Sequence, residues 1–215
     1  MRRSIWLLSL ATLAFASPVA MDTDSEASSR HPRIVMIVAP REFTDREYND
    51  PRSVFEAKGA LVTVASTKTA HAVSHDLARL RIDTTIRELT LDQFDAIVVV
   101  GGTGALTYLL DDEALRNLIV AASRSNKIVA AICVAPAVLA RAGVLRNTPA
   151  TCYPDRRIIA ILKMNGADYA ERSVVVSGRI VTANGPESAK DFAVQVLEAL
   201  RTLGARCASD TRAQI

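Results

Sequence analysis

Cysteine, aromatic residues and an excess of charge of one sign are all scarce in this chain of 215 residues. Its three cysteines are too few for a disulfide framework, and a chain of this length can bury enough apolar surface to fold without one. The 26 basic and 23 acidic residues leave a net charge of only +3, which does not predict a nucleic-acid surface. We therefore expect a globular protein that binds a small molecule and no nucleic acid.

Apolar runs long enough to cross a bilayer, which takes about 20 residues, are also missing. At the N-terminus two arginines precede a shorter apolar run over residues 5–16, and the small residues Ala14 and Ala16 have the spacing of a signal peptidase site. This pattern predicts a secretory signal peptide over residues 1–20, followed by a flexible lead-in over residues 21–32. The alternatives are an uncleaved anchor or a wrongly assigned start codon. We expect export to a bacterial periplasm and no membrane span after cleavage.

Short apolar segments alternate with helical patterns in the rest of the chain. The apolar segments are typical of strands buried on both faces of a parallel sheet. The alternation predicts an α/β fold in one domain over residues 33–204, a doubly wound and mostly parallel sheet, followed by a loose C-terminal tail over residues 205–215. The expected strands are 33–39, 61–66, 96–100 and 128–132, and the expected helices are 51–58, 112–123, 135–142 and 188–203.

Capping residues define the expected helix ends. Asp50 before Pro51 predicts one helix start and Asp111 predicts another, because aspartate caps the first turn of a helix and proline fits there. Glycine predicts the C-terminal ends, since it adopts the left-handed conformation that stops a helix. These glycines are Gly59, Gly143 and Gly204.

Two stretches depart from the alternation of strands and helices. The segment VVVSGRIVT over residues 174–182 predicts an antiparallel hairpin with Ser177 and Gly178 in its turn. Residues 71–88 are polar and aperiodic, so they predict no regular element. We expect the hairpin to be added to the main sheet.

The segment IVAAICVAP over residues 128–136 places Cys133 where a buried strand ends and a helix begins. A thiol on such a nucleophile elbow lies at the sheet edge where ligands bind in α/β folds. The N-terminal amides of the following helix favour the thiolate and can bind a developing oxyanion. The alternative is that Cys133 is a small buried hydrophobic residue.

Several motifs together resemble the ThiJ/PfpI superfamily, which includes the Parkinson-associated deglycase, bacterial glyoxalase and deglycase proteins and an archaeal intracellular protease. KIVAAIC with a proline three residues on, LARAGVLR and ATCYP resemble its elbow region, and FDAIVVVGG resembles its double-glycine loop. VVVSGRIVTANGPESAKDFA resembles its hairpin, glycine-proline turn and last helix, and residues 33–42 with 55–66 resemble its first βαβ unit. The resemblance covers residues 33–203 and implies a flavodoxin-like, class I glutamine amidotransferase-like fold and a homodimer.

The resemblance also implies a catalytic site built on Cys133. Glu42, in IVAPREF, stands where the family places a glutamate that contacts the thiol, although a charged loop residue can equally be exposed. The amides of Gly102 and Val134 are expected to form an oxyanion or ligand site. Tyr153 in ATCYP can hydrogen-bond a ligand, or pack as a tyrosine at the edge of the core. We expect no metal and no cofactor.

The sequence departs from this family at the histidines. Val134 follows the cysteine where many members have a histidine base, so a peptidase is doubtful. We expect His31, His71 and His75 to be solvent-exposed, although the spacing of His71 and His75 would suit a metal pair on a helix.

A second cysteine, Cys152, is a candidate resolving thiol for Cys133 in an oxidising compartment. Disulfide geometry is demanding, however, and sequence position does not establish it.

Three functions are compatible with these features. The first is a cysteine-dependent enzyme for small reactive carbonyls such as methylglyoxal or their adducts, in which Cys133 adds to the aldehyde and Glu42 moves protons. The second is a non-catalytic, redox-responsive stress protein or chaperone in which Cys133 is oxidised to sulfinate. The third is an exported binding domain whose site is inactive.

Overall fold

The computed structural model describes residues 31–212, with side chains described through Leu203. The predicted signal peptide and all but the last two residues of the lead-in therefore lie outside the described residues. Between residues 31 and 212, no helix combines the length and the apolar character that a membrane span requires.

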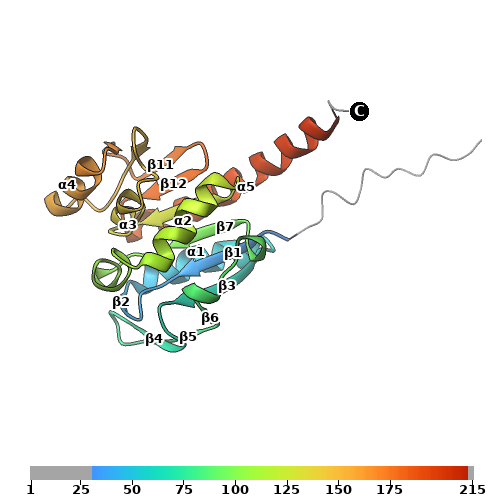
Figure 1. Cartoon of the computed structure of the whole chain (residues 1–215). Helices are drawn as coiled ribbons and strands as arrows, with labels where there is room; N and C mark the ends of the chain where they lie inside the picture. Colours follow the sequence, from blue (N-terminus) through green and yellow to red (C-terminus); the bar gives the residue numbers. More distant parts are fainter. Residues whose placement is uncertain (1–30, 213–215) are drawn as a thin grey trace, which may run out of the picture. The chain divides into compact units, whose positions relative to one another are not determined.

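A seven-stranded sheet forms the centre of the fold (Figure 1), in the order β11-β12-β8-β7-β1-β3-β6. All neighbouring strands are parallel except β11 and β12, which form the predicted antiparallel hairpin at one edge. The strands are β1 (Arg33–Ile37), β3 (Leu61–Ser66), β6 (Thr84–Thr85), β7 (Ala96–Val99), β8 (Ile128–Ile132), β11 (Val174–Ser177) and β12 (Ile180–Ala183). The mostly parallel α/β fold expected from the sequence is confirmed.

The central strands β7 and β8 are buried along their whole length, which explains why both are continuously apolar in sequence. Helices cover the sheet on both faces (Figure 1), with α1 and α5 packed against each other. The helices are α1 (Asp45–Ala57), α2 (Glu113–Arg124), α3 (Pro136–Arg141), α4 (Arg156–Met164) and α5 (Ala189–Arg212). Because β1, β7, β8 and β12 run parallel, the loops that follow them meet at one edge of the sheet.

The start of α1 differs from the prediction. The helix begins at Asp45 after Thr44, which has an extended conformation, and Pro51 lies inside it. A proline there has no N–H to donate to the carbonyl of Glu47, so the helix loses one backbone hydrogen bond and some stability. Burial outweighs that cost, because Glu47, Tyr48, Pro51 and Phe55 form one buried face. Asp50 is therefore a residue of the helix interior and not its N-cap.

Two other predicted helix ends are also wrong. The cap of α2 is Asp112, whose carboxylate accepts a hydrogen bond of 2.8 Å from the amide of Leu115, and not Asp111. α5 continues past Gly204 to Arg212 and so includes most of the predicted loose tail. A glycine inside a helix costs about 1 kcal/mol relative to alanine, which does not by itself end the helix.

The polar stretch 71–88 contains strands that the sequence did not predict. β4 (Ala70–Ser74) and β5 (Arg79–Ile82) form an antiparallel hairpin, and β4 pairs with β2 (Arg41–Phe43) in a small separate sheet. β9 (Pro149–Ala150) and β10 (Asp168–Tyr169) form another short pair. The hairpin has no regular apolar pattern because only three of its nine strand residues, Ala72, Ser74 and Ile82, are buried, and Ser74 is polar.

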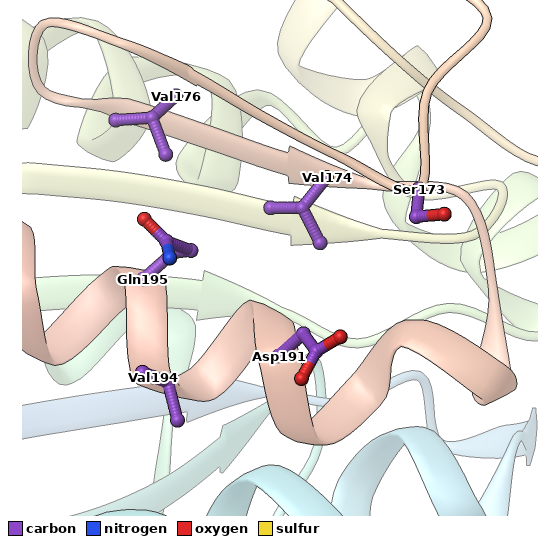
Figure 2. Close-up of a pocket in the computed structure, with 6 residues that line it drawn as sticks. All are labelled: Ser173, Val174, Val176, Asp191, Val194 and Gln195. Atoms are coloured by element: carbon purple, nitrogen blue, oxygen red, sulfur yellow. The ribbon is translucent and has the colours of Figure 1, made fainter.

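A groove of about 300 Å³ lies between the edge strand β11 and α5 (Figure 2). Val174 and Val176 of the strand face Gln195 of the helix across it. Its remaining lining residues are Ser173, Asp191 and Val194. None of these residues takes part in the site around Cys133.

Candidate active site

Cys133 lies on a strained strand-to-helix turn at the end of β8. Its φ is 65°, a left-handed conformation that residues with a side chain rarely adopt. Its amide donates a hydrogen bond of 2.8 Å to the carbonyl of Ala183, and its carbonyl accepts one of 2.7 Å from the amide of Tyr153. α3 begins three residues later at Pro136. These contacts hold the thiol at the edge where the central strands end, with 7% of the residue exposed.

Two backbone amides face the sulfur of Cys133. They belong to Gly102 and Val134, the pair expected to form an oxyanion site, and both stabilise the thiolate form. Gly102 has a φ of 102°, and a Cβ at this position would collide with the carbonyl oxygen of Glu42. Only glycine therefore fits where the loop brings this amide to the sulfur.

A buried carboxyl group completes the surroundings of the thiol. Glu47, in the first turn of α1, is 0% exposed and faces the Cys133 thiol and the amide of Gly101. By hydrogen-bond geometry both carboxyl oxygens lack a partner within the described part of the chain, so these are contacts and not full hydrogen bonds. Burial raises the pKa of Glu47 to about 7, and the contacts with the thiol and with Gly101 oppose this only partly. Glu47 can thus hold or accept a proton near neutral pH.

The structure places Glu42 away from the thiol, so the expected contact is made by a different glutamate. Glu42 lies in β2 with a φ of 57°, is exposed, and accepts a hydrogen bond of 2.9 Å from the hydroxyl of Thr103. The sequence carries a signal for Glu47, because Glu47, Pro51 and Phe55 are spaced four residues apart and share one helix face. That signal can be used only if the helix is started directly after Thr44, at Asp45.

Burial also dominates the electrostatics of the thiol. The pKa of Cys133 is raised, first by burial and then by the charge of Glu47 and its contact with the thiol, while the Gly102 and Val134 amides lower it. The sequence-based expectation that these amides favour the thiolate is correct in direction, but they do not outweigh burial. Loss of charge on Glu47 by protonation therefore makes the thiolate easier to form.

Tyr153 lies at the mouth of the site. The residue is 45% exposed, and a Cβ at Gly185 would be 3.6 Å from its ring. Because the tyrosine amide is bonded to the carbonyl of Cys133, its backbone is fixed beside the elbow. No described residue bonds its hydroxyl, and contact of the exposed ring with a ligand stays a prediction.

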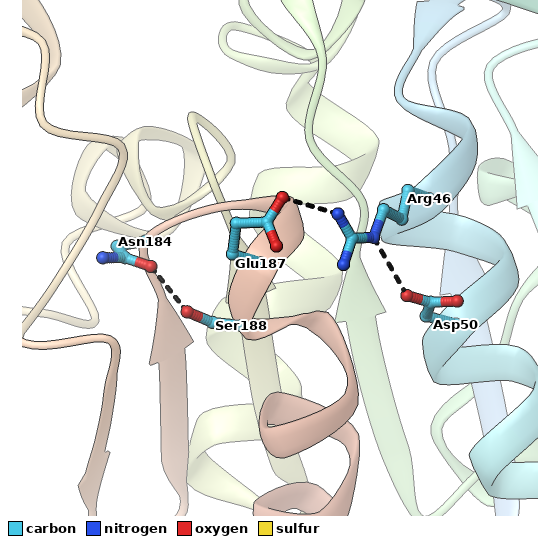
Figure 3. Close-up of polar contacts among 5 residues, drawn as sticks. All are labelled: Arg46, Asp50, Asn184, Glu187 and Ser188. Atoms are coloured by element: carbon cyan, nitrogen blue, oxygen red, sulfur yellow. Dashed lines mark hydrogen bonds and ion pairs between the residues drawn. The ribbon is translucent and has the colours of Figure 1, made fainter.

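Polar contacts tie the start of α1 to the loop after β12 (Figure 3). Arg46, the neighbour of Glu47, donates a hydrogen bond of 2.5 Å to Glu187 and another of 3.3 Å to Asp50. In the same loop the hydroxyl of Ser188 donates to the side-chain oxygen of Asn184 at 2.7 Å. The exposed contact of Arg46 with Glu187 connects the elements that carry Glu47 and the Cys133 partner Ala183, and the part-buried contact of Ser188 with Asn184 lies within the loop itself.

The remaining candidates from the sequence lie outside this cluster. His71 and His75 are exposed, as expected, and no group of three metal-ligating side chains occurs among the residues that the structure describes. Cys133 and Cys152 are both free and buried, and burial raises the pKa of Cys152 to about 12. No backbone amide lowers the pKa of Cys152, in contrast to Cys133.

Comparisons with known proteins agree with this fold. The family model described as the DJ-1/PfpI family matches residues 32–199. An uncharacterised protein of Methanocaldococcus jannaschii is 38% identical over 193 residues, 89% of this chain and 94% of that protein. Protein/nucleic acid deglycase 2 of Escherichia coli is 31% identical over 174 residues, 80% of this chain and 98% of the other.

A solved structure gives the same result. The crystal structure of a ThiJ/PfpI domain protein from Brachyspira murdochii has a TM-score of 0.77 and 33% sequence identity, and the match covers 81% of this chain and 99% of the other. With a family match across most of the described residues, the chain belongs to the DJ-1/PfpI family.

Proposed function

We propose that this protein is a cysteine-dependent enzyme that acts on small reactive carbonyls, or on their adducts with thiols and amines. One observation carries the proposal: the thiol of Cys133 lies between two backbone amides and a buried carboxyl group that titrates near neutral pH. The Escherichia coli relative named as a deglycase supports the choice of substrate class.

The first step is the addition of the thiol to an aldehyde. The carboxylate of Glu47 takes the thiol proton while the sulfur of Cys133 bonds to the aldehyde carbon, and the carbonyl π electrons move to the oxygen. The amides of Gly102 and Val134, which face the sulfur, would also stabilise the negative charge that develops on the oxygen beside it. Glu47 returns the proton to that oxygen, which gives a hemithioacetal.

With methylglyoxal the second step moves a proton between neighbouring carbons. Glu47 removes the proton from the carbon bonded to sulfur, and the resulting enediol is protonated on the next carbon. The product is a lactoyl thioester of Cys133. Water then attacks the thioester carbon, the sulfur leaves with a proton, and lactate is released. The sum is methylglyoxal plus water giving lactic acid.

The same site argues against a peptidase. Among the described residues no histidine is bonded to the thiol, and Val134 occupies the position directly after it. A peptidase must protonate an amine leaving group. Carbonyl addition needs only the local proton transfers that one carboxyl group supplies.

The test is lactate formation from methylglyoxal by the purified protein. We expect Cys133→Ser to abolish lactate formation and Glu47→Gln to reduce it about 100-fold, the contribution typical of general acid–base catalysis. Cys152→Ser is the matched control, because it removes a buried thiol that does not face Glu47, and it should retain activity. Lactate formation by Cys133→Ser at the wild-type rate would contradict the mechanism.

A second candidate function rests on the same surroundings. Two amides that face the sulfur, together with a protonated Glu47, would also stabilise a sulfinate formed when two equivalents of peroxide oxidise Cys133. The protein would then act as a redox-responsive stress protein or chaperone. Mass spectrometry after mild peroxide treatment tests this role: sulfinate confined to Cys133 supports it, and oxidation without preference for Cys133 contradicts it.

We further propose that the protein is exported and that it forms a homodimer. The N-terminal sequence pattern supports export to a bacterial periplasm, and the family resemblance supports a homodimer. Fractionation of cells producing the full chain tests the first, with loss of the first residues in the mature protein as the expected result. Light scattering tests the second, and a monomeric mass at micromolar concentration would contradict it.

A further inference from the structure

The strand β11 leaves one edge of the central sheet open. It is the last strand in the sheet order and pairs with β12 alone. The amide of Asn184 donates to the carbonyl of Ser173, so Ser173 and every second residue after it turn their backbone groups toward β12. The N–H and C=O groups of Val174 and Val176 therefore point outward, and no residue that the structure describes bonds them.

Apolar side chains line the same edge. Val174 and Val176 lie on the face of the sheet that α5 covers, where they border the groove described above (Figure 2). Val176 is 45% exposed and Val194 of α5 is 50% exposed, although both are apolar. Proteins usually protect an open edge with charged residues or proline, and β11 has neither. This edge is therefore a template for pairing with another strand.

The two ends of the edge differ in charge. Asp191 lies in the groove beside the start of β11, and Arg179 lies at the other end, in the turn between β11 and β12. Both side chains are exposed, and neither has a polar partner among residues 31–203. Glu171 and Arg172, which precede the strand, offset each other, and Lys190 does not line the groove. The start of the edge is thus acidic and its far end is basic.

A second copy of β11 fits this edge when the two strands run antiparallel, with the two-fold axis at Val175. In this register Val174 of each copy opposes Val176 of the other, and each such pair exchanges two backbone hydrogen bonds. All the outward groups of both strands are then bonded. The same symmetry brings Arg179 of each copy to the end where the other copy carries Asp191. The edge is complementary to itself in hydrogen bonding and in charge.

We propose that two copies of this protein pair through β11 and form one continuous sheet. The proposal gives the homodimer proposed above a specific surface, and it is independent of the reaction at Cys133. The surface is nevertheless connected to the elbow, because β12 lies between β11 and β8 and its Ala183 carbonyl accepts a hydrogen bond from the amide of Cys133. Pairing of β11 would therefore restrain the strand that holds the elbow.

A cross-linking experiment tests the register. Opposed residues at a non-hydrogen-bonded position of an antiparallel pair have Cα atoms about 4.5 Å apart, which a disulfide can bridge. Val175 would occupy such a position opposite itself. With oxidised glutathione as the oxidant, we expect Val175→Cys to give a disulfide-linked dimer. Val176→Cys is the matched control and should not be linked, because the two copies of this residue are offset along the strands.

All cross-linking samples carry Cys207→Ser, so that a link through the native cysteine cannot be mistaken for one through the edge. Linking of Val176→Cys to the same extent as Val175→Cys would overturn the proposal, because it would indicate random collision. A homodimer that light scattering detects and that Val175→Cys does not link would overturn pairing through β11 and leave the proposed homodimer intact.

Charge reversal tests the contact between the two ends. We expect Arg179→Glu and Asp191→Arg each to raise the dissociation constant of the dimer about 10-fold in sedimentation experiments, because each variant places like charges together at both ends. The double variant should restore dimerisation, and failure to do so would overturn the proposed orientation. Arg124→Glu, at an exposed position on α2, is the matched control and should dimerise as the wild type does.

Amide hydrogen exchange shows what covers the edge. The amides of Val174 and Val176 should exchange more slowly as the protein concentration rises, since pairing protects them. Slow exchange that does not depend on concentration would show that a segment of the same chain covers the edge, and would overturn the proposal. Lactate formation from methylglyoxal tests the proposed reaction separately.

Discussion

Replacing Glu47 with glutamine should change how the stability of the folded protein depends on pH. Burial raises the pKa of Glu47 from its ordinary value of 4.5 to about 7. Between these values the folded protein holds a proton that the unfolded chain has released. The resulting stabilisation is complete below pH 4.5 and is lost as the pH rises through 7.

The size of this effect follows from the pKa difference. Each pKa unit corresponds to about 1.4 kcal/mol, so the free energy of unfolding should fall by roughly 2 to 3 kcal/mol between pH 5 and pH 8 because of Glu47 alone. Glutamine has a similar shape and does not titrate. The stability difference between wild type and Glu47→Gln should therefore change by this amount over that range.

Urea unfolding followed by circular dichroism at pH 5, 6, 7 and 8, at constant ionic strength, measures the effect. Glu171→Gln is the matched control, since it removes an exposed carboxylate, and its stability profile should run parallel to that of the wild type. Parallel profiles for wild type and Glu47→Gln would refute the reasoning, because Glu47 would then titrate alike in the folded and unfolded protein.

Three further predictions follow from the same geometry. Above pH 8, Glu47→Gln should speed alkylation of Cys133 by iodoacetamide, because the charge of Glu47 raises the pKa of the thiol; a slower rate would contradict this. Gly101→Ala should destabilise the protein by about 2 kcal/mol in urea unfolding, since the new Cβ would lie 2.7 Å from the Cβ of Cys133 and collide with Glu47; an unchanged midpoint would exclude that crowding. Asp112→Ala should cost about 1 kcal/mol by loss of the α2 cap, whereas Asp111→Ala should cost less than half as much, and equal losses would show that neither residue is a specific cap.

The parts of the fold that depend on burial could be predicted from the sequence. β3 and β8 have the predicted bounds because both are apolar and occupy interior positions of the sheet. The hairpin of β11 and β12 and the elbow at Cys133 follow from local patterns that the structure bears out. A turn motif or a continuous apolar run is compatible with few other local structures at such places.

The parts that depend on long-range contacts could not be predicted. Asp50 and Pro51 are a strong local signal for a helix start, but burial of Tyr48 and Phe55 extends α1 over the preceding turn. A helix that starts at Pro51 leaves Glu47 in a loop. The wrong helix start is therefore also the reason why the buried position of Glu47 was not predicted. The contact of His75 with Thr103 could not be predicted from local sequence, because the two residues are 28 positions apart.

The small exposed fraction of Cys133 limits the size of what can react there. At 7% exposure the sulfur lies below the surrounding surface, so a slender molecule or the tip of an extended side chain can reach it and a folded backbone cannot. Adducts carried on free amino acids, short peptides or the ends of long lysine and arginine side chains would be accessible. The same modification on a residue held close to a protein surface would be out of reach.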